Sequence, residues 1–239
     1  MIVASLATFP PRRASLAGVV AQILPQVDRL NIVFNQYETV PEQYRSNPVI
    51  HAVIPHEDTK DVGKFYVDES AADYVLFLDD DIDYPHDYVA LTVARFSALP
   101  IDRAVGGYHC SRYYRPQLFW TPKELRAWTV FHIHPRKVAR YRHVTGFKHK
   151  VARPMVVDQV GTGVAIMRGR DTPPYDYMRS SQKFVDVRLA RWCFEQGIVP
   201  VALPSEADWL HSEADAQSIS LTFTSHNPKN VADEIRTFA

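Results

Sequence analysis

The apolar run YVLFL at residues 74–78 constrains the fold more than any other feature of this sequence. Its residues do not alternate between apolar and polar, which is typical of a strand buried on both faces of a parallel sheet. Aspartate follows at once and fills four of the five positions from Asp79 to Asp83. Parallel strands need crossover connections, usually helices, so we expect strands and helices to alternate along the chain.

The first half of the sequence has this alternation. Its apolar spacing predicts strands at 2–8, 30–36, 49–55, 74–78 and 103–109, and helices at 14–24, 62–72 and 85–99. The pattern predicts an α/β fold with a doubly wound, mostly parallel sheet flanked by helices.

The second half is less regular. It predicts a strand at 127–134, a strand at 156–168 interrupted by Gly161 and Gly163, a helix at 183–197 closed by Gly197, and a last strand at 198–204. The two glycines of VGTGV could mark either a close approach of the backbone to a sugar or a bulge. No linker rich in proline, glycine or serine divides the chain. We therefore expect a single domain over residues 1–211, followed by a polar tail, 212–239, that could pack on the same domain.

Composition narrows the possible partners. The 239 residues carry 27 Lys+Arg and 27 Asp+Glu, so no overall charge favours nucleic acid. The two cysteines, Cys110 and Cys193, can build neither a disulfide framework nor a cysteine zinc site, which fits a reduced, cytoplasmic setting. No apolar run approaches the ~20 residues of a membrane-spanning helix, and we interpret the N-terminal MIVASLAT as a strand rather than a signal peptide.

The aspartates stand where open α/β sheets bind their ligands, at the carboxyl end of a strand. Neighbouring carboxylates repel one another, and a divalent cation removes that cost. Mg²⁺ and Mn²⁺ use one or two carboxylates together with substrate phosphates, so the cluster predicts a metal–diphosphate site. A solvated acidic turn before a helix, where aspartate complements the helix dipole, is the main alternative. Asp83 could support the metal ligands, but we expect it to be the N-cap of the following helix. A calcium loop is a third, although the glycine and distal glutamate of an EF-hand are missing.

The segment VLFLDDDIDYP resembles the DXD motif of nucleotide-sugar glycosyltransferases of the GT-A fold, especially family 2. Four other segments resemble the same group in the same order, and together the likeness covers roughly residues 2–211: ATFPPR (7–12), DVGKF (61–65), VDQVGTGVAIMR (157–168) and FVDVRLARWCFEQGIVPVALP (184–204). The resemblance implies a GT-A-like sheet and a nucleotide-diphosphate sugar as donor, with UDP as the default nucleotide.

The resemblance also assigns metal ligands. It implies that Asp81 and Asp79 bind Mn²⁺ or Mg²⁺, and that Asp79 and Asp80 hold ribose or metal-bound water. His211, just past the last strand, matches a late histidine that several such enzymes use on the metal or the phosphates. A single histidine in a loop is more often structural, so both interpretations of His211 stay open.

Further residues are expected, from the resemblance, to bind the nucleotide sugar: Thr8, Pro10 and Arg12 at the base, Asn35 at the uridine, and Asp61 and Lys64 near the base or phosphates. His109 ends the fifth predicted strand, at the same edge as the aspartates, and could contact the acceptor or the donor sugar. Each has a structural alternative. FPPRR could be only a rigid exit from the first strand, Asn35 an ordinary turn residue, the Asp61–Lys64 segment a solvated helix start, and His109 a core histidine.

Asp186 is the expected general base. An inverting transferase needs one carboxylate that deprotonates the acceptor hydroxyl as it attacks the anomeric carbon. The resemblance places a catalytic aspartate in the late helix, where Asp186 lies near the N-terminus. An aspartate at this position could also merely complement the helix dipole.

The stretch 136–153 carries seven Lys/Arg and no acidic residue. It could contact anionic lipid at the inner membrane face, a lipid-diphosphate acceptor or an acidic glycan. It could also close over the donor as a loop, or be a solvated face.

The sequence thus predicts a metal-dependent glycosyltransferase acting on a saccharide or lipid-linked acceptor in polysaccharide biosynthesis. The alternative is a non-catalytic carbohydrate- or nucleotide-binding protein on the same fold. A nucleotidyltransferase usually has a phosphate loop rich in glycine and lysine near its N-terminus, and it is disfavoured because ATFPPRRASL contains no glycine. A HAD-type phosphatase carries its nucleophilic aspartate after the first strand, and it is disfavoured because the aspartates here follow a later strand.

Overall fold

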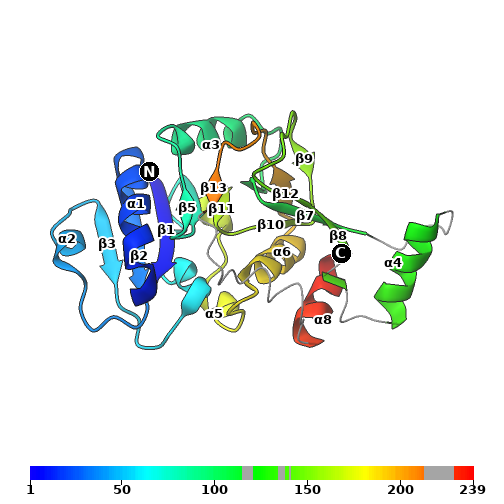
Figure 1. Cartoon of the computed structure of the whole chain (residues 1–239), viewed down its shortest axis with the longest axis horizontal. Helices are drawn as coiled ribbons and strands as arrows, with labels where there is room; N and C mark the ends of the chain where they lie inside the picture. The colour runs from blue at the N-terminus through cyan, green and yellow to red at the C-terminus, as the bar shows by residue number, and fades with distance from the viewer. Residues whose placement is uncertain (115–120, 134–137, 140, 213–228) are drawn as a thin grey trace.

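A computed structural model describes residues 1–114, 121–133, 138–139, 141–212 and 229–239. Its centre is an eight-stranded sheet in the order β3-β2-β1-β4-β11-β6-β12-β9 (Figure 1). The strands are β1 (Ile2–Thr8), β2 (Arg29–Phe34), β3 (Ile50–Val53), β4 (Tyr74–Leu78), β6 (Ala104–Gly107), β9 (Met155–Val156), β11 (Val164–Met167) and β12 (Val199–Ala202).

Most of these strands run in one direction. β3, β2, β1 and β4 pair in parallel, and so do β6 and β12. β11 is antiparallel to both β4 and β6, and β9 is antiparallel to β12. The expected fold, a single-domain α/β structure around a mostly parallel sheet flanked by helices, is therefore confirmed.

Helices cover both faces of the sheet (Figure 1). α1 (Arg13–Ile23) and α3 (Tyr88–Ser97) contribute to one apolar cluster, and α6 (Val185–Gln196) contributes to the other. β4 supplies Leu76 and Leu78 to the first cluster and Val75 and Phe77 to the second. The apolar run without alternation is thus a strand buried on both sides, as predicted.

Two smaller sheets lie beside the main one. β10 (Gln159–Val160), β7 (Cys110–Tyr113) and β8 (Arg142–Thr145) form a three-stranded antiparallel sheet. β5 (Ile82–Asp83) pairs with β13 (His211–Ser212), so the end of the aspartate run meets a segment that follows the last strand of the main sheet.

Short elements complete the chain: the 3₁₀ helices η1 (Pro10–Arg12), η2 (Leu24–Gln26), η3 (Lys60–Phe65) and η5 (Gly169–Asp171), and the helices α2 (Glu42–Arg45), α4 (Pro122–Ile133), α5 (Tyr175–Met178) and α8 (Lys229–Phe238). α8 packs on α6: Val231, Ile235 and Phe238 share an apolar cluster with Val187 and Ala190. Residues 213–228 of the expected tail lie outside the described residues.

The prediction of a helix at 62–72 was wrong. η3 ends at Phe65, and the segment beyond it contains an Asx turn in which the backbone N–H of Ser70 donates to Asp68. Gly63 packs so tightly against the first two strands that a Cβ there would lie 2.5 Å from Thr59 Oγ1 and 3.0 Å from the Ala7 Cβ. The tertiary contact overrides the helical spacing.

Two strand predictions also need correction. Residues 127–133 belong to helix α4, which begins with a capping box in which Thr121 and Glu124 exchange hydrogen bonds; His134 lies outside the described residues. The single strand expected at 156–168 is divided into β9, β10 and β11, which belong to two different sheets.

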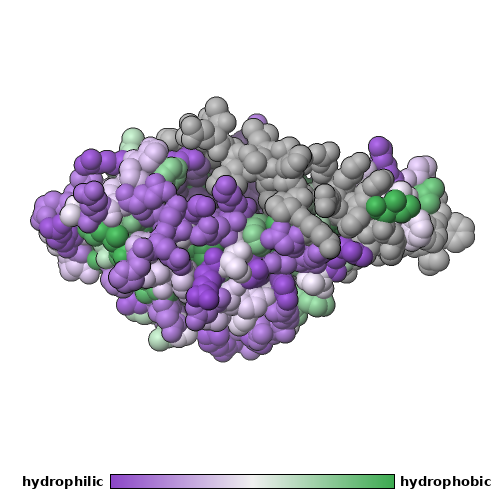
Figure 2. Space-filling view, turned by 90° about the horizontal axis from the view of Figure 1, so that it is seen from below, coloured by the Kyte–Doolittle hydropathy of each residue, from purple (hydrophilic) through white to green (hydrophobic). Residues whose placement is uncertain are grey.

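Within the described ranges, no helix is long and apolar enough to cross a membrane. The face shown in Figure 2 is mostly hydrophilic, with apolar side chains scattered among the polar ones.

Candidate active site

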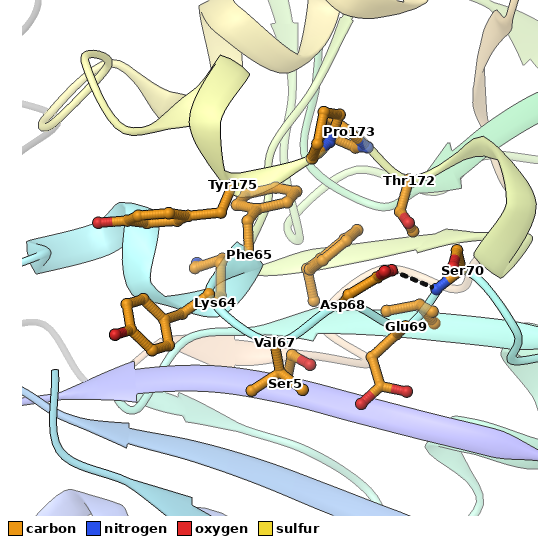
Figure 3. A pocket seen from close by; sticks show the side chains of 14 residues that line it. Ser5, Lys64, Phe65, Val67, Asp68, Glu69, Ser70, Thr172, Pro173 and Tyr175 are labelled. Atoms are coloured by element: carbon orange, nitrogen blue, oxygen red, sulfur yellow. Dashed lines mark hydrogen bonds between the residues drawn. The ribbon is translucent and has the colours of Figure 1, made fainter.

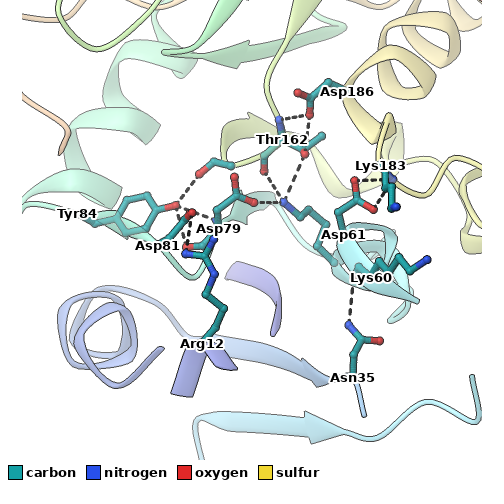
Figure 4. A network of polar contacts seen from close by, with 12 residues as sticks. Arg12, Asn35, Lys60, Asp61, Asp79, Asp81, Tyr84, Thr162, Lys183 and Asp186 are labelled. Atoms are coloured by element: carbon teal, nitrogen blue, oxygen red, sulfur yellow. Dashed lines mark hydrogen bonds and ion pairs between the residues drawn. The ribbon is translucent and has the colours of Figure 1, made fainter. Parts of the chain in front are cut away.

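Asp79 lies where β4 ends, at the carboxyl edge of the parallel strands (Figure 4). Its backbone N–H donates to the Tyr84 hydroxyl at 3.0 Å, and that hydroxyl donates to the carbonyl of Gly163 at 2.6 Å. Tyr84 is fully buried. It therefore fixes the start of the aspartate run against the loop that leads into β11.

Lys64 is the central cation of the site. It comes from η3, is buried, and donates from Nζ to the Asp79 carboxylate; Nζ also lies 3.4 Å from the carbonyl and the hydroxyl of Thr162. Burial alone would lower the Lys64 pKa, but the carboxylates of Asp79, Asp186 and Asp61 outweigh it, so the pKa is raised. Lys64 stays an ammonium ion between them.

Asp186 lies in the first turn of α6 and faces the same network. Its Oδ1 accepts two hydrogen bonds of 2.8 Å, from the backbone N–H and the hydroxyl of Thr162. Among the described residues, Asp186 Oδ2 receives no hydrogen bond. Thr162 thus joins Lys64, and through it Asp79, to the expected general base (Figure 4).

The other two aspartates have separate partners. Asp81 forms a 3.0 Å ion pair with Arg12 of η1, and its pKa is raised by burial and by Asp79, against the opposing charge of Arg12. Asp80 is buried and accepts a 2.7 Å hydrogen bond from the Thr8 hydroxyl at the end of β1. Burial raises the pKa of Asp80 to about 6, although the Thr8 bond opposes the shift.

Gly163 is required by the closeness of Asp79. A Cβ at this position would lie 2.1 Å from Asp79 Oδ2. The sequence left two explanations for the glycines of VGTGV, a bulge or a close approach to a sugar. At Gly163 the close approach is to the carboxylate of Asp79 instead.

Asn35 and Asp61 bind the backbone of neighbouring loops. Asn35 Oδ1 accepts from the N–H of Thr59 at 2.8 Å, and its amide donates to the carbonyl of Lys60 at 3.1 Å. Asp61 accepts two hydrogen bonds from the N–H of Lys183, and burial raises its pKa. Both side chains brace the edge of the site. Pro10 is exposed in η1, two residues before Arg12.

The two histidines have different surroundings. His109 follows β6, packs edge-on against Phe147 at 5.9 Å, and has its pKa lowered by burial although Asp186 opposes the shift. His211 is exposed in β13, paired in register with Asp83. Asp83 accepts a hydrogen bond from Gln22, and α3 begins only after Asp87, so the expected N-cap role of Asp83 was wrong.

Comparisons with known proteins give a structural likeness only. No family model matches the chain, and no curated protein matches it. Glucosyl-3-phosphoglycerate synthase from Mycobacterium tuberculosis, in complex with Mn²⁺, UDP-glucose and phosphoglyceric acid, superposes with a TM-score of 0.52 and 13% identity, over 99% of this chain and 79% of that chain. The complex of the same synthase with Mn²⁺, UDP and phosphoglyceric acid superposes with a TM-score of 0.52 and 12% identity, over 99% of this chain and 78% of that chain. A further mycobacterial protein superposes with a TM-score of 0.50 and 12% identity, over 91% of this chain and 68% of that chain.

The chain shares its fold with this synthase. At 12–13% identity the likeness concerns the fold alone. The roles of individual residues therefore have to be argued from their own geometry.

The donor set fits a magnesium or manganese ion that is completed by a ligand. Asp79 and Asp81 offer carboxylate oxygens, and their side chains are 44% and 25% exposed. Across the part of the chain that the structure describes, no three His, Cys, Asp or Glu side chains gather into a preformed cage. Two carboxylates plus substrate phosphates are the usual arrangement for these ions, which retain open positions for phosphate and water.

A cavity of about 280 Å³ lies on the sheet face covered by η3 and the turn after it (Figure 3). Its lining includes Ser5 of β1, Phe77 of β4, and Tyr66 and Tyr175, whose rings meet edge-on. It exists where a regular helix at 62–72 was expected. Asp79, Asp81 and Asp186 do not line this cavity, but Lys64 does, so the cavity adjoins the polar network at Lys64.

Thr162, Tyr84 and Gly163 were missed as parts of the site. Thr162 and Gly163 stand in the motif VGTGV, whose paired glycines were interpreted as a bulge or a close approach to a sugar, and not as a contact with Asp79. Tyr84 carried no such signal, because a buried tyrosine after a strand is an ordinary core residue.

Proposed function

We propose that this protein is a metal-dependent glycosyltransferase that moves a sugar from a nucleotide-diphosphate donor, a UDP-sugar, to a saccharide or lipid-linked acceptor. One observation carries the proposal. The network Asp79–Lys64–Thr162–Asp186 links the donor-side carboxylate to a candidate base at the carboxyl edge of the sheet. The Mn²⁺ and UDP-glucose held by the synthase of similar fold support the choice of metal and donor.

On the donor side, Asp79 and Asp81 would hold Mn²⁺ or Mg²⁺, with His211 as a further ligand. A bound divalent ion supplies positive charge to the diphosphate as it leaves. Lys64 forms an ion pair with Asp79 and Arg12 forms one with Asp81, so both cations add positive charge where the diphosphate would bind.

The nucleoside would occupy the edge beyond β1 and β2. Asp80 is the proposed ribose contact, held by Thr8. Pro10 lies at the exposed rim, and Asn35 and Asp61 shape the loops below the base. His109 is the proposed sugar contact, since both Asp186 and Asp79 act electrostatically on its ring.

On the acceptor side, Asp186 would act as the base. Thr162 fixes Oδ1, and Oδ2 takes the proton of the acceptor hydroxyl. The acceptor oxygen then bonds to the anomeric carbon while the bond from that carbon to the diphosphate breaks on the opposite face, so the configuration inverts. Proton NMR of the first-formed product checks this step, and a retained configuration would rule out the single-base mechanism.

The acceptor is the least constrained part. Of the basic stretch 136–153, residues 136–137 and 140 lie outside the described residues. The remainder includes β8, where exposed His143 pairs in register with exposed Arg112 of β7. These side chains support an anionic or lipid-linked acceptor on the Asp186 side of the sheet.

Calorimetric titration of UDP with and without Mn²⁺, on the wild type and on Asp81→Ala, tests the proposal. We expect UDP to bind with metal and the variant to lose most of this affinity. If UDP binds equally tightly without Mn²⁺, the aspartates do not bind the diphosphate through a metal ion. A screen for nucleotide release from sugar donors then separates an enzyme, which turns one of them over, from a binding protein, which turns over none.

A further inference from the structure

Each of the two carboxylates proposed to hold the metal is already paired with a cation of the chain. Lys64 Nζ donates to Asp79, and Arg12 lies 3.0 Å from Asp81. The two cations come from different 3₁₀ helices: Arg12 from η1, which follows β1 in the chain, and Lys64 from η3, which packs against β1. The arrangement neutralises the acidic pair from within the protein.

Lys64 is held in place more firmly than a surface lysine. Its side chain is 2% exposed, and Nζ lies 3.4 Å from both oxygens of Thr162. Thr162 is itself bound to Asp186. An ammonium ion so enclosed cannot simply swing into solvent when another cation approaches Asp79.

A divalent ion and these side chains compete for the same oxygens. A metal ion on Asp79 and Asp81 would stand beside an ammonium and a guanidinium group, and like charges repel strongly where water is partly excluded. A diphosphate reverses the balance. Its oxygens can face Lys64 and Arg12 while they also coordinate the metal, so all the positive groups then meet negative charge.

We propose that Lys64 and Arg12 are internal counterions that keep a divalent metal off Asp79 and Asp81 until a nucleoside diphosphate arrives. The inference rests on the metal site of the proposed function and adds an order of binding: the metal is held firmly only once the nucleoside diphosphate is present. Metal alone binds weakly, and metal and diphosphate bind together with strong positive coupling, which must be the same in whichever order it is measured.

The test is a titration of Mn²⁺ alone, with free Mn²⁺ measured by its electron paramagnetic resonance signal. The proteins are the wild type, Lys64→Met, Arg12→Met and a matched control, Lys60→Met. Lys60 lies in the same 3₁₀ helix, and its exposed side chain makes no hydrogen bond to the described residues. We expect Lys64→Met to bind Mn²⁺ about tenfold more tightly than the wild type, and Lys60→Met to match the wild type.

The same titration in the presence of UDP completes the cycle. We expect UDP to tighten Mn²⁺ binding strongly in the wild type and less in Lys64→Met. The proposal is overturned if folded Lys64→Met binds Mn²⁺ no better than the wild type, or if UDP binds the wild type and yet leaves its affinity for Mn²⁺ unchanged. Circular dichroism melts verify folding. Should Lys64→Met not fold, Arg12→Met decides, because the Arg12 side chain reaches solvent, at 16% exposure.

The outcomes separate this inference from the proposed function. If wild-type protein binds UDP with Mn²⁺ but Lys64→Met gains no affinity for Mn²⁺ alone, the counterion role fails and the donor site stands. If none of the nucleotides UDP, GDP and CMP binds, with or without metal, the donor site fails. A gain of Mn²⁺ affinity in Lys64→Met would still support the counterion role of Lys64.

Discussion

At the scale of single residues, the position of Asp79 depends on the absence of a side chain at Gly163. In Gly163→Ala the new Cβ would fall 2.1 Å from Asp79 Oδ2, so the carboxylate must move. We expect affinity for UDP with Mn²⁺ to fall at least about tenfold, since one misplaced ligand costs on the order of 1.4 kcal/mol or more. Calorimetry measures the affinity, and a thermal melt shows whether the fold persists.

Gly18→Ala is the matched control, since a Cβ there meets nothing within 4 Å. Gly18 lies inside α1, so alanine should leave the affinity unchanged and stabilise the protein by about 0.5–1 kcal/mol. Unchanged nucleotide affinity in Gly163→Ala would mean that the exact place of Asp79 does not matter for binding.

Asp186→Asn tests the base without disturbing its support. The amide oxygen of asparagine can still accept the two hydrogen bonds from Thr162, so the residue should stay in place while losing its basicity. We expect kcat with an active donor to fall by about 10²–10⁴ and UDP affinity to remain. Asp176→Asn, in α5 with a side chain 88% exposed, should change neither. A variant Asp186→Asn with full kcat would exclude Asp186 as the base.

The sequence could place some of these residues and not others. A carboxylate directly after a buried strand must lie at the strand's carboxyl end, so the general position of Asp79–Asp81 followed from the chain alone. Its contacts did not follow, because Lys64 meets Thr162 across 98 positions of sequence and Tyr84 meets Gly163 across 79. Such contacts depend on how strands are ordered in the sheet, which no local pattern encodes.

At the scale of elements, strands and long amphipathic helices were predictable because their apolar spacing matches their burial, as in α1 with Leu16, Val19, Val20 and Ile23. The predictions failed where another force decides. Residues 62–72 give way to close packing at Gly63, and a capping box starts α4 where a strand was expected. α8 was missed although Val231, Ile235 and Phe238 have helical spacing, since the apolar surface they pack against lies on α6.

The pair Arg188–Glu234 joins α6, which carries Asp186, to α8. Arg188 donates from two nitrogens to Glu234 and from a third to the carbonyl of Tyr177, and both members of the pair are nearly buried. Glu234→Ala leaves the guanidinium uncompensated, so we expect the free energy of unfolding to fall by about 3–5 kcal/mol. Urea denaturation measures the loss.

Asp233→Ala is the matched control on the same helix, because its exposed side chain makes no contact to the described residues. It should change the free energy of unfolding by no more than about 0.5 kcal/mol. If Glu234→Ala is as mild as Asp233→Ala, α8 is only loosely attached to α6.

At the scale of the whole molecule, the sheet divides the apolar core into two layers, and the antiparallel β11 lies between the two parallel groups of strands. The loop before β11 brings Thr162 to Asp186, while β11 pairs with the aspartate strand β4. One strand thus ties the two halves of the proposed site together. Motions that separate the halves would have to break its ladders with both β4 and β6.

Cys110 and Cys193 report on the stability of one of these layers, since both belong to the cluster that lies on the α6 face of the sheet. They are 1% and 0% exposed, and burial raises the pKa of both thiols, that of Cys193 to about 12. A thiol reacts as its thiolate, so Ellman's reagent should modify both at least about 10³-fold more slowly in the native protein than in concentrated guanidinium chloride. Rapid labelling of either cysteine in the native state would show that this layer opens without unfolding of the sheet.

The two buried thiols also make the stability depend on pH. Because the unfolded thiols ionise near pH 8.5, the free energy of unfolding should fall as the pH rises above that value, by up to about 1.4 kcal/mol per pH unit for each thiol.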